Sequence, residues 1–166
     1  MVSTEDVKRL REETGGGVMA CKRALDEADG DFDRAKELLR AAGVAAAAKR
    51  SDRATSQGLV EAYIHGEGRI GAIVEVQCET DFVARTETFK ELARNIAMQV
   101  AAMNPLALTV EDVPSDAPGA AEDHALLAQS FIKDSSRNIG DIVQDAIAQT
   151  GENIQIGRFS RFELGG

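Results

Sequence analysis

The chain has 166 residues, enough for one medium domain or two small ones. Its net charge is −9 and unevenly spread: residues 1–53 carry 11 basic and 11 acidic side chains, whereas residues 54–166 carry 8 and 17. Nucleic acids and anionic membranes select clustered Lys and Arg, so this acidic chain excludes both as expected partners. Because the sequence contains neither a membrane-length apolar run nor the apolar core of a signal peptide, we expect a cytoplasmic protein.

Residues 1–53 predict a bundle of three short helices and an extension. Ser3 and Asp6 have the spacing of a capping box, and the glycines at 15–17 break the first helix. A second helix is expected over 18–28. A third is expected to end at Gly43, followed by an Ala-rich and then basic stretch that also favours helix. We expect residues 1–53 to form a domain of their own.

Residues 54–166 predict a second domain with both strands and helices. Apolar residues alternate along 70–78, and Glu67-Gly68 indicates a hairpin turn with the preceding strand. Helical spacing follows over 86–103 and 139–150, a strand is expected over 153–164, and the proline-containing stretch 105–125 is expected to be a loop. The predicted fold class is therefore α+β, with a small antiparallel sheet packed by helices.

The sequence offers no set of residues for catalysis. Residues 66–71 match the letters of a dinucleotide-binding loop, but they lie between two strands instead of between a strand and a helix. His65 and His124 are far apart in the sequence, no serine lies in a nucleophile elbow, and Cys21 and Cys78 form no close-spaced pair. We expect a protein that is not an enzyme, with reduced thiols and with no metal or cofactor.

The segment from Cys78 to Arg85 joins a strand to the long helix. Thr80 or Asp81 is suited to cap the helical turn that follows. Phe82 has two interpretations: an anchor of the core, which composition alone favours, or an exposed wedge for a partner, since aromatic side chains are frequent interface hot spots.

This segment is also where the chain resembles a known family. Residues 80–85, Thr-Asp-Phe-Val-Ala-Arg, resemble the core signature of elongation factor Ts, and residues 10–25 resemble its first-domain signature. Leu39-Arg40 with Gly43, and residues 151–154, match two further blocks in family order. The resemblance is to the short form with a single core repeat. It implies a ubiquitin-associated-like three-helix bundle over 1–53 and an α+β core over 54–166.

The resemblance implies a guanine-nucleotide exchange factor that binds elongation factor Tu in its GDP-bound and nucleotide-free states. It places Thr80, Asp81, Phe82 and Val83 at the nucleotide-binding domain of that GTPase. From the N-terminal bundle it places Val18, Met19 and Lys22 against the same domain, with Val18 where the family usually has methionine. The alternative is a non-catalytic adaptor with a helical-bundle binding module and a dimerisation core.

The last strand suggests a homodimer. Ile154 and Ile156 are expected on one face and Phe159 on the other, and a small sheet leaves its edges open for pairing. The resemblance adds that short family members use a second subunit to supply the missing half of the core. We predict an interface through Phe159, Ser160 and Phe162, which is non-covalent at Ser160 because serine forms no disulfide.

Overall fold

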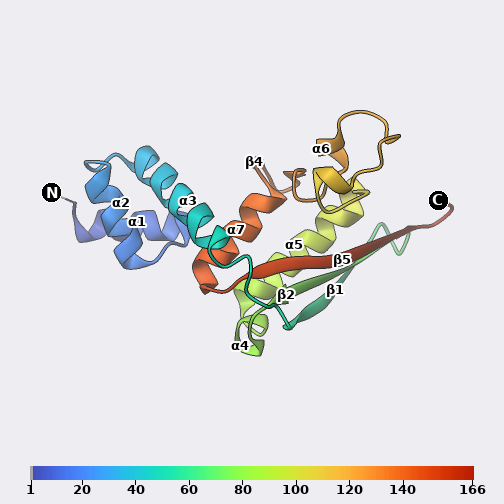
Figure 1. The fold of residues 1–166 in the computed structure, drawn as a ribbon, viewed down its shortest axis with the longest axis horizontal. Helices are drawn as coiled ribbons and strands as arrows, with labels where there is room; N and C mark the ends of the chain where they lie inside the picture. The colour runs from blue at the N-terminus through green and yellow to red at the C-terminus, as the bar shows by residue number, and fades with distance from the viewer. Residues whose placement is uncertain (1) are drawn as a thin grey trace.

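The computed structural model describes residues 2–166 and begins with three packed helices (Figure 1). These are α1 (Thr4–Thr14), α2 (Val18–Glu27) and α3 (Phe32–Ala48). The capping box is present: the Ser3 hydroxyl accepts from the Asp6 N–H at 3.1 Å, and the Asp6 carboxylate accepts from the Ser3 N–H at 3.0 Å. Gly15 ends α1 with a φ of 68°, a left-handed conformation that suits glycine. The helices enclose a small core of Val7, Leu10, Cys21, Ala24, Leu25, Ala28 and Ala35.

The third helix does not end at Gly43 as expected; it continues to Ala48. Its C-terminal half packs against α7 (Ile139–Thr150), and a Cβ at Gly43 would lie 3.7 Å from the Ala148 Cβ, so the glycine permits close approach of the two helices. Arg40 of α3 pairs with Asp141 of α7 at 2.5 Å. Tertiary packing therefore outweighs the low helix propensity of one glycine. The division of the chain at residue 53 stays a prediction.

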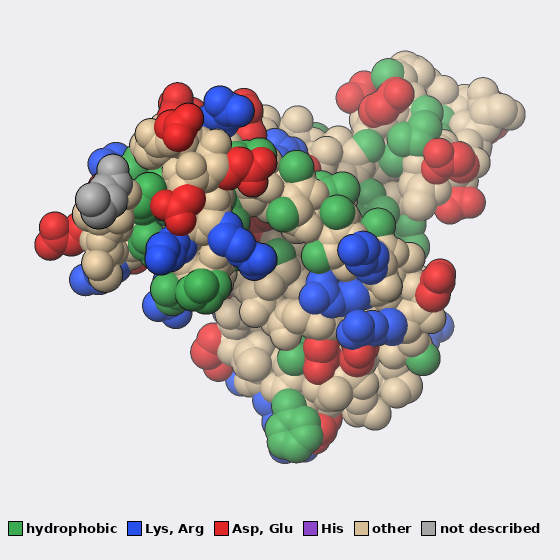
Figure 2. Space-filling model, turned by 60° about the vertical axis from the view of Figure 1, so that its left-hand side comes forward, with side chains coloured by type: hydrophobic (Ala, Val, Ile, Leu, Met, Phe, Trp, Pro, Cys, Tyr) green, Lys and Arg blue, Asp and Glu red, His purple; other side chains and the backbone are tan. Residues whose placement is uncertain are grey.

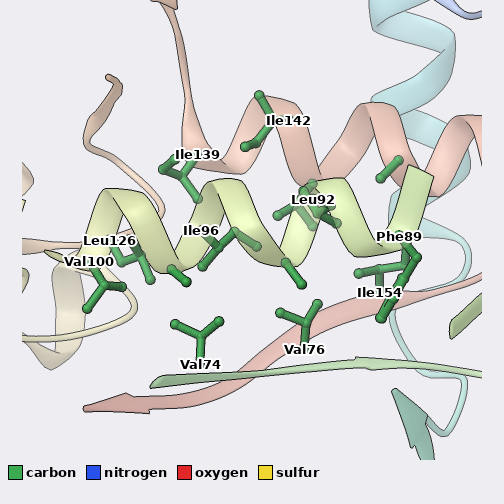
Figure 3. Close-up of a cluster of buried hydrophobic side chains, with 14 of the residues drawn as sticks. Val74, Val76, Phe89, Leu92, Ile96, Val100, Leu126, Ile139, Ile142 and Ile154 are labelled. Carbon is green, nitrogen blue, oxygen red and sulfur yellow. The ribbon is translucent and has the colours of Figure 1, made fainter. Parts of the chain in front are cut away.

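The rest of the chain is built on a three-stranded antiparallel sheet, in the order β1 (Gln57–His65), β2 (Ile70–Cys78) and β5 (Ile154–Glu163). The long helix α5 (Glu87–Met103) lies across one face, called the inner face here, and α7 lies on the other side of α5 (Figure 1). Figure 3 shows Val74 and Val76 pointing from β2 towards α5, whose other side meets Ile139 and Ile142 of α7. The predicted α+β class is confirmed.

The last strand contains a bulge that the sequence analysis missed. Pairing with β2 shifts register between Glu75 and Val76, which leaves Gly157 as the extra residue. As a result Ile154, Ile156 and Phe159 all pair with buried residues of β2, namely Cys78, Val76 and Val74. The expectation that Phe159 lies on the face opposite the two isoleucines is wrong, because the bulge returns its side chain to the inner face.

Residues 104–138 are more structured than the predicted loop. They contain a 3₁₀ turn η1 (Val110–Asp112), a short α6 (Ala121–His124), and a small hairpin of β3 (Ser130–Phe131) and β4 (Asp134–Asn138). The fully buried Gln99 of α5 holds this hairpin, because its amide donates to the Ser130 carbonyl and its oxygen accepts from the Ile132 N–H, both at 3.0 Å. Across residues 2–166, no helix has the length and apolar content needed to cross a membrane.

Candidate functional site

The signature segment forms α4 (Asp81–Ala84), a single helical turn between two caps. Thr80 is the N-cap, with its hydroxyl accepting from the Val83 N–H at 3.4 Å, and Thr86 caps the next helix in the same way through Phe89. The turn is therefore fixed at both ends by side chains that the sequence itself supplies. It lies where the central strand of the sheet ends and α5 begins (Figure 1).

Phe82 projects from this turn into solvent. Its side chain is 77% exposed, the largest exposure of any large hydrophobic residue among residues 2–166. Val83 is half-buried against the main core and Ala84 is buried, while the adjacent fully buried Phe89 fills the core. The interpretation of Phe82 as a core anchor is therefore wrong. A large aromatic side chain held in water by a rigid turn is typical of a binding anchor.

Asp81 does not cap the turn. Its carboxylate pairs with Arg85, one helical turn later, at 2.8 Å; the Arg85 side chain is exposed and that of Asp81 is about half-exposed. An exposed ion pair of this kind contributes little to stability, so a partner could recruit either charge at small cost. Asp81, Phe82 and part of Val83 thus form one accessible surface, with Thr80 beneath it.

A second loop, which was not among the predicted site residues, braces this turn. The Glu152 carboxylate accepts from the backbone N–H of Glu79 at 3.1 Å, from the N–H of Thr80 at 3.0 Å, and from the Thr80 hydroxyl at 2.6 Å. Glu79 in turn accepts from the Asn153 N–H at 2.7 Å. The only advance signal was the family block at residues 151–154, because contacts between residues so distant in sequence leave no local pattern.

Hydrogen bonding and charge shift the ionisation of these groups. The N–H of Asn153, followed by Arg53 at 3.4 Å, holds the pKa of Glu79 below its usual range, against a smaller opposing effect of burial. Burial and the nearby Glu152 carboxylate raise the pKa of the Cys78 thiol, whose Sγ donates to the Thr80 carbonyl. Glu79 is therefore a carboxylate and Cys78 a neutral thiol at neutral pH, and neither is arranged as a nucleophile.

The N-terminal bundle presents a separate candidate surface at the start of α2. Val18 is 52% exposed and Met19 is 64% exposed, and Lys22 is also exposed, whereas Cys21, Ala24 and Leu25 of the same helix face inward. Figure 2 shows one face of the whole molecule. On this face, several hydrophobic side chains protrude into solvent, many Lys and Arg side chains lie in the middle, and most Asp and Glu side chains lie nearer the periphery. This α2 surface and the α4 turn belong to different parts of the fold and are not one continuous site (Figure 1).

The outer face of the sheet, away from α5, has an apolar patch towards the β1–β2 turn, whereas its other end carries Glu75, Gln77 and Arg158. Ser160 pairs with Ile73 and Phe162 with Gly71, so both lie on this face, while Phe159 does not. A shallow groove here is lined in part by Ile64, Ile73, Phe162 and Leu164. All four side chains are more than two-fifths exposed, as is the neighbouring Val60. Of the three residues predicted for a dimer interface, two are available on the outer face.

Within residues 2–166, no group of three or more His, Cys, Asp and Glu side chains is placed to hold a metal ion. His65 stacks on Tyr63, with its Nδ1 3.0 Å from the tyrosine hydroxyl, and His124 lies against the Pro118 carbonyl at 2.5 Å. Both histidines are thus occupied by local contacts. What the site offers is exposed apolar and charged surface, which suits binding of another protein.

Comparisons with known proteins identify the family of this chain. The family model described as Elongation factor TS matches residues 33–119, a stretch that includes the α4 turn. Curated relatives named Elongation factor Ts, from Moorella thermoacetica, Carboxydothermus hydrogenoformans and Thermotoga maritima, are 45%, 46% and 43% identical to this chain. The alignments cover 99% of this chain and 96%, 90% and 96% of the respective relatives. The chain therefore belongs to the elongation factor Ts family, as the four sequence blocks predicted.

Proposed function

We propose that this chain releases GDP from elongation factor Tu by pressing the rigid α4 turn against its nucleotide-binding domain while the N-terminal bundle binds another part of the same domain. Family membership makes the chain a guanine-nucleotide exchange factor for elongation factor Tu and does not favour the adaptor alternative. The observation that carries the proposed mechanism is Phe82, 77% exposed on a turn that is capped at both ends.

The physical basis of exchange is linkage between two ligands of the GTPase. A protein that binds nucleotide-free elongation factor Tu more tightly than the GDP form must weaken GDP binding by the same factor. No covalent bond forms or breaks in this chain, so no catalytic residue is needed. GDP release is driven by contacts between this chain and elongation factor Tu that form fully only when the nucleotide site of the GTPase is disturbed.

Each contact has its own role in this proposal. Phe82 is the wedge, Asp81 supplies a charge beside it, and Thr80 and Val83 complete the surface of the turn. A wedge must keep its position against the partner, and Phe82 meets that requirement because its turn is held between β2 and α5. Val18, Met19 and Lys22 on α2 supply affinity. Lys22 adds a salt-sensitive charge to two exposed apolar side chains. The site of action is the cytoplasm, where translation takes place.

We also propose a homodimer through the outer face of the sheet. Exposed apolar residues from all three strands form a patch on this face, and β1 and β5 are both open edges. Phe162 lies on the edge strand β5, in register with Gly71 near the end of the sheet, and Ser160 lies on the same face two residues earlier. A second copy seated here would bury the patch. Phe159, which faces α5, would contribute only by supporting the strand.

The exchange proposal is tested by release of fluorescent GDP from elongation factor Tu. The expected result is faster release with turnover, so that substoichiometric amounts of this protein empty an excess of the GTPase. Stoichiometric trapping without turnover, or no acceleration, would contradict it.

The dimer proposal is tested by light scattering at micromolar concentration. Phe162→Glu should convert a dimer of the native protein into a folded monomer, because a charge would be buried without a partner. Glu122→Gln, far from the sheet, is the control. A native protein that scatters as a monomer would refute the proposal.

A further inference from the structure

We propose that Glu152 is a positioning residue for exchange: it fixes the direction in which the α4 turn presents Phe82. This inference rests on the proposed role of Phe82 as the wedge. Glu152 does not contact the GTPase in this proposal. It acts through the turn, so its loss should leave binding in place and reduce the effectiveness of the wedge.

The first support is convergence of three donors on one carboxylate. The backbone N–H groups of Glu79 and Thr80 donate to one oxygen of Glu152, and the Thr80 hydroxyl donates to the other at 2.6 Å. Charge-assisted bonds of this kind are among the stronger ones in proteins. They occupy consecutive backbone groups directly before α4, so the path of the chain into the turn is fixed by a single side chain.

The second support is that the same contact orients the N-cap. The Thr80 hydroxyl has one proton, which it donates to Glu152, so its lone pairs are free to accept from the Val83 N–H. Phe82 lies between Thr80 and Val83 in sequence. The capping bond and the brace therefore enclose the residue that carries the wedge, although neither involves the Phe82 side chain.

The third support comes from the topology. Cys78, the last residue of β2, pairs with Ile154, the first residue of β5, so the loop after α7 lies beside the turn before α4. Gly151 ends α7 with a φ of 75°, and Glu152 follows at once. The brace is reciprocal, since Glu79 accepts from the N–H of Asn153. Two short loops thereby hold each other.

The brace also reaches the segment that joins the bundle to the core. The buried Asn153 side chain donates to the Arg53 carbonyl at 2.9 Å, and Arg53 pairs with Glu79. The loop at 151–153 thus ties the α4 turn to residue 53. In this arrangement the wedge and the incoming N-terminal segment share one support, which keeps the turn rigid when the bundle is bound to a partner.

A purely structural carboxylate would stabilise the fold without changing what Phe82 does. The two roles separate in a double-mutant cycle on GDP release from elongation factor Tu. The variants are Glu152→Gln, Phe82→Ala and the pair, with Glu122→Gln as a matched control on α6, at the opposite end of α5 from the turn (Figure 1). Glutamine keeps the length of the side chain but replaces one acceptor oxygen with a donor.

We expect Glu152→Gln to lower the maximal release rate about tenfold, because only a minority of molecules then hold the wedge in position. The concentration for half-maximal release should change less than about twofold, since the α2 surface is intact. In the Phe82→Ala background, Glu152→Gln should lower the maximal release rate little further, because its effect acts through the missing Phe82 side chain. Glu122→Gln should behave as the native protein.

Other outcomes overturn the proposal in distinguishable ways. A native rate for Glu152→Gln, or an equal loss with and without Phe82, would show that Glu152 does not act through the wedge. A normal rate for Phe82→Ala would instead remove the wedge itself. If circular dichroism shows that Glu152→Gln is unfolded at the assay temperature, the same cycle is run for all variants at a lower temperature at which it is folded. A native maximal rate for folded Glu152→Gln there would overturn the proposal.

Discussion

Truncation of Phe82 to alanine should separate exchange activity from stability. The side chain is 77% exposed, so truncation removes only about a quarter of a phenylalanine's possible burial. At roughly 1.5–3 kcal/mol for complete burial, the expected loss of unfolding free energy is about 0.7 kcal/mol or less. For a chain of this size that lowers Tm by about 3 °C at most.

The effect on exchange should be far larger. Removing an interface hot spot typically costs at least about 2 kcal/mol, which corresponds to about 30-fold slower GDP release. Phe89→Ala is the matched control, because Phe89 is fully buried seven residues along the chain. It should cost about 3–5 kcal/mol of stability and lower Tm markedly. Both variants are measured by thermal unfolding and, while folded, by fluorescent GDP release. Normal release by Phe82→Ala, together with a large drop in Tm, would refute the reasoning.

Three further predictions follow from other parts of the fold. Lys22→Ala should raise the concentration for half-maximal exchange by up to about fivefold at low salt and less at high salt, without changing the maximal rate; an unchanged concentration would return Lys22 to the solvated surface. Deleting residues 1–53 should leave a core that unfolds cooperatively but binds elongation factor Tu weakly, and a core without a cooperative transition would contradict the predicted domain boundary. Because the folded-state pKa of Glu79 is lowered, its stabilising bond to Asn153 is complete above the ordinary carboxyl range and is lost as pH falls through the lowered pKa. The Tm difference between the native protein and Glu79→Gln should therefore shrink on acidification, and a difference independent of pH would argue against the bond.

Local signals predicted much of the fold. The capping box at Ser3, the alternating strand at 70–78 and the helix beginning after Thr86 all depend on neighbouring residues, and each is present. The end of the third helix was predicted wrongly at Gly43, because packing of α3 on α7 is a long-range effect. The short hairpin at 130–138 was missed because it depends on hydrogen bonds from the buried Gln99.

The candidate site was predictable only in part. Residues 80–85 and the start of α2 were identifiable by resemblance to a family, and the exposure of Phe82 needed the structure to decide between two interpretations. The bulge at Gly157 moved Phe159 to the inner face, and no local pattern announces a bulge. Glu152 reaches Thr80 across 72 positions of sequence, so its contact depends on the pairing of β2 with β5.

Exchange by linkage is tested most directly by two affinities measured on the same proteins. One is the affinity of this chain for nucleotide-free elongation factor Tu relative to the GDP-bound form, by titration calorimetry. The other is the affinity of GDP for elongation factor Tu alone relative to its affinity for elongation factor Tu saturated with this chain. Differential binding predicts that both ratios are well above one and equal to each other. Equal affinity for the two forms of the GTPase, at any strength of binding, would contradict it.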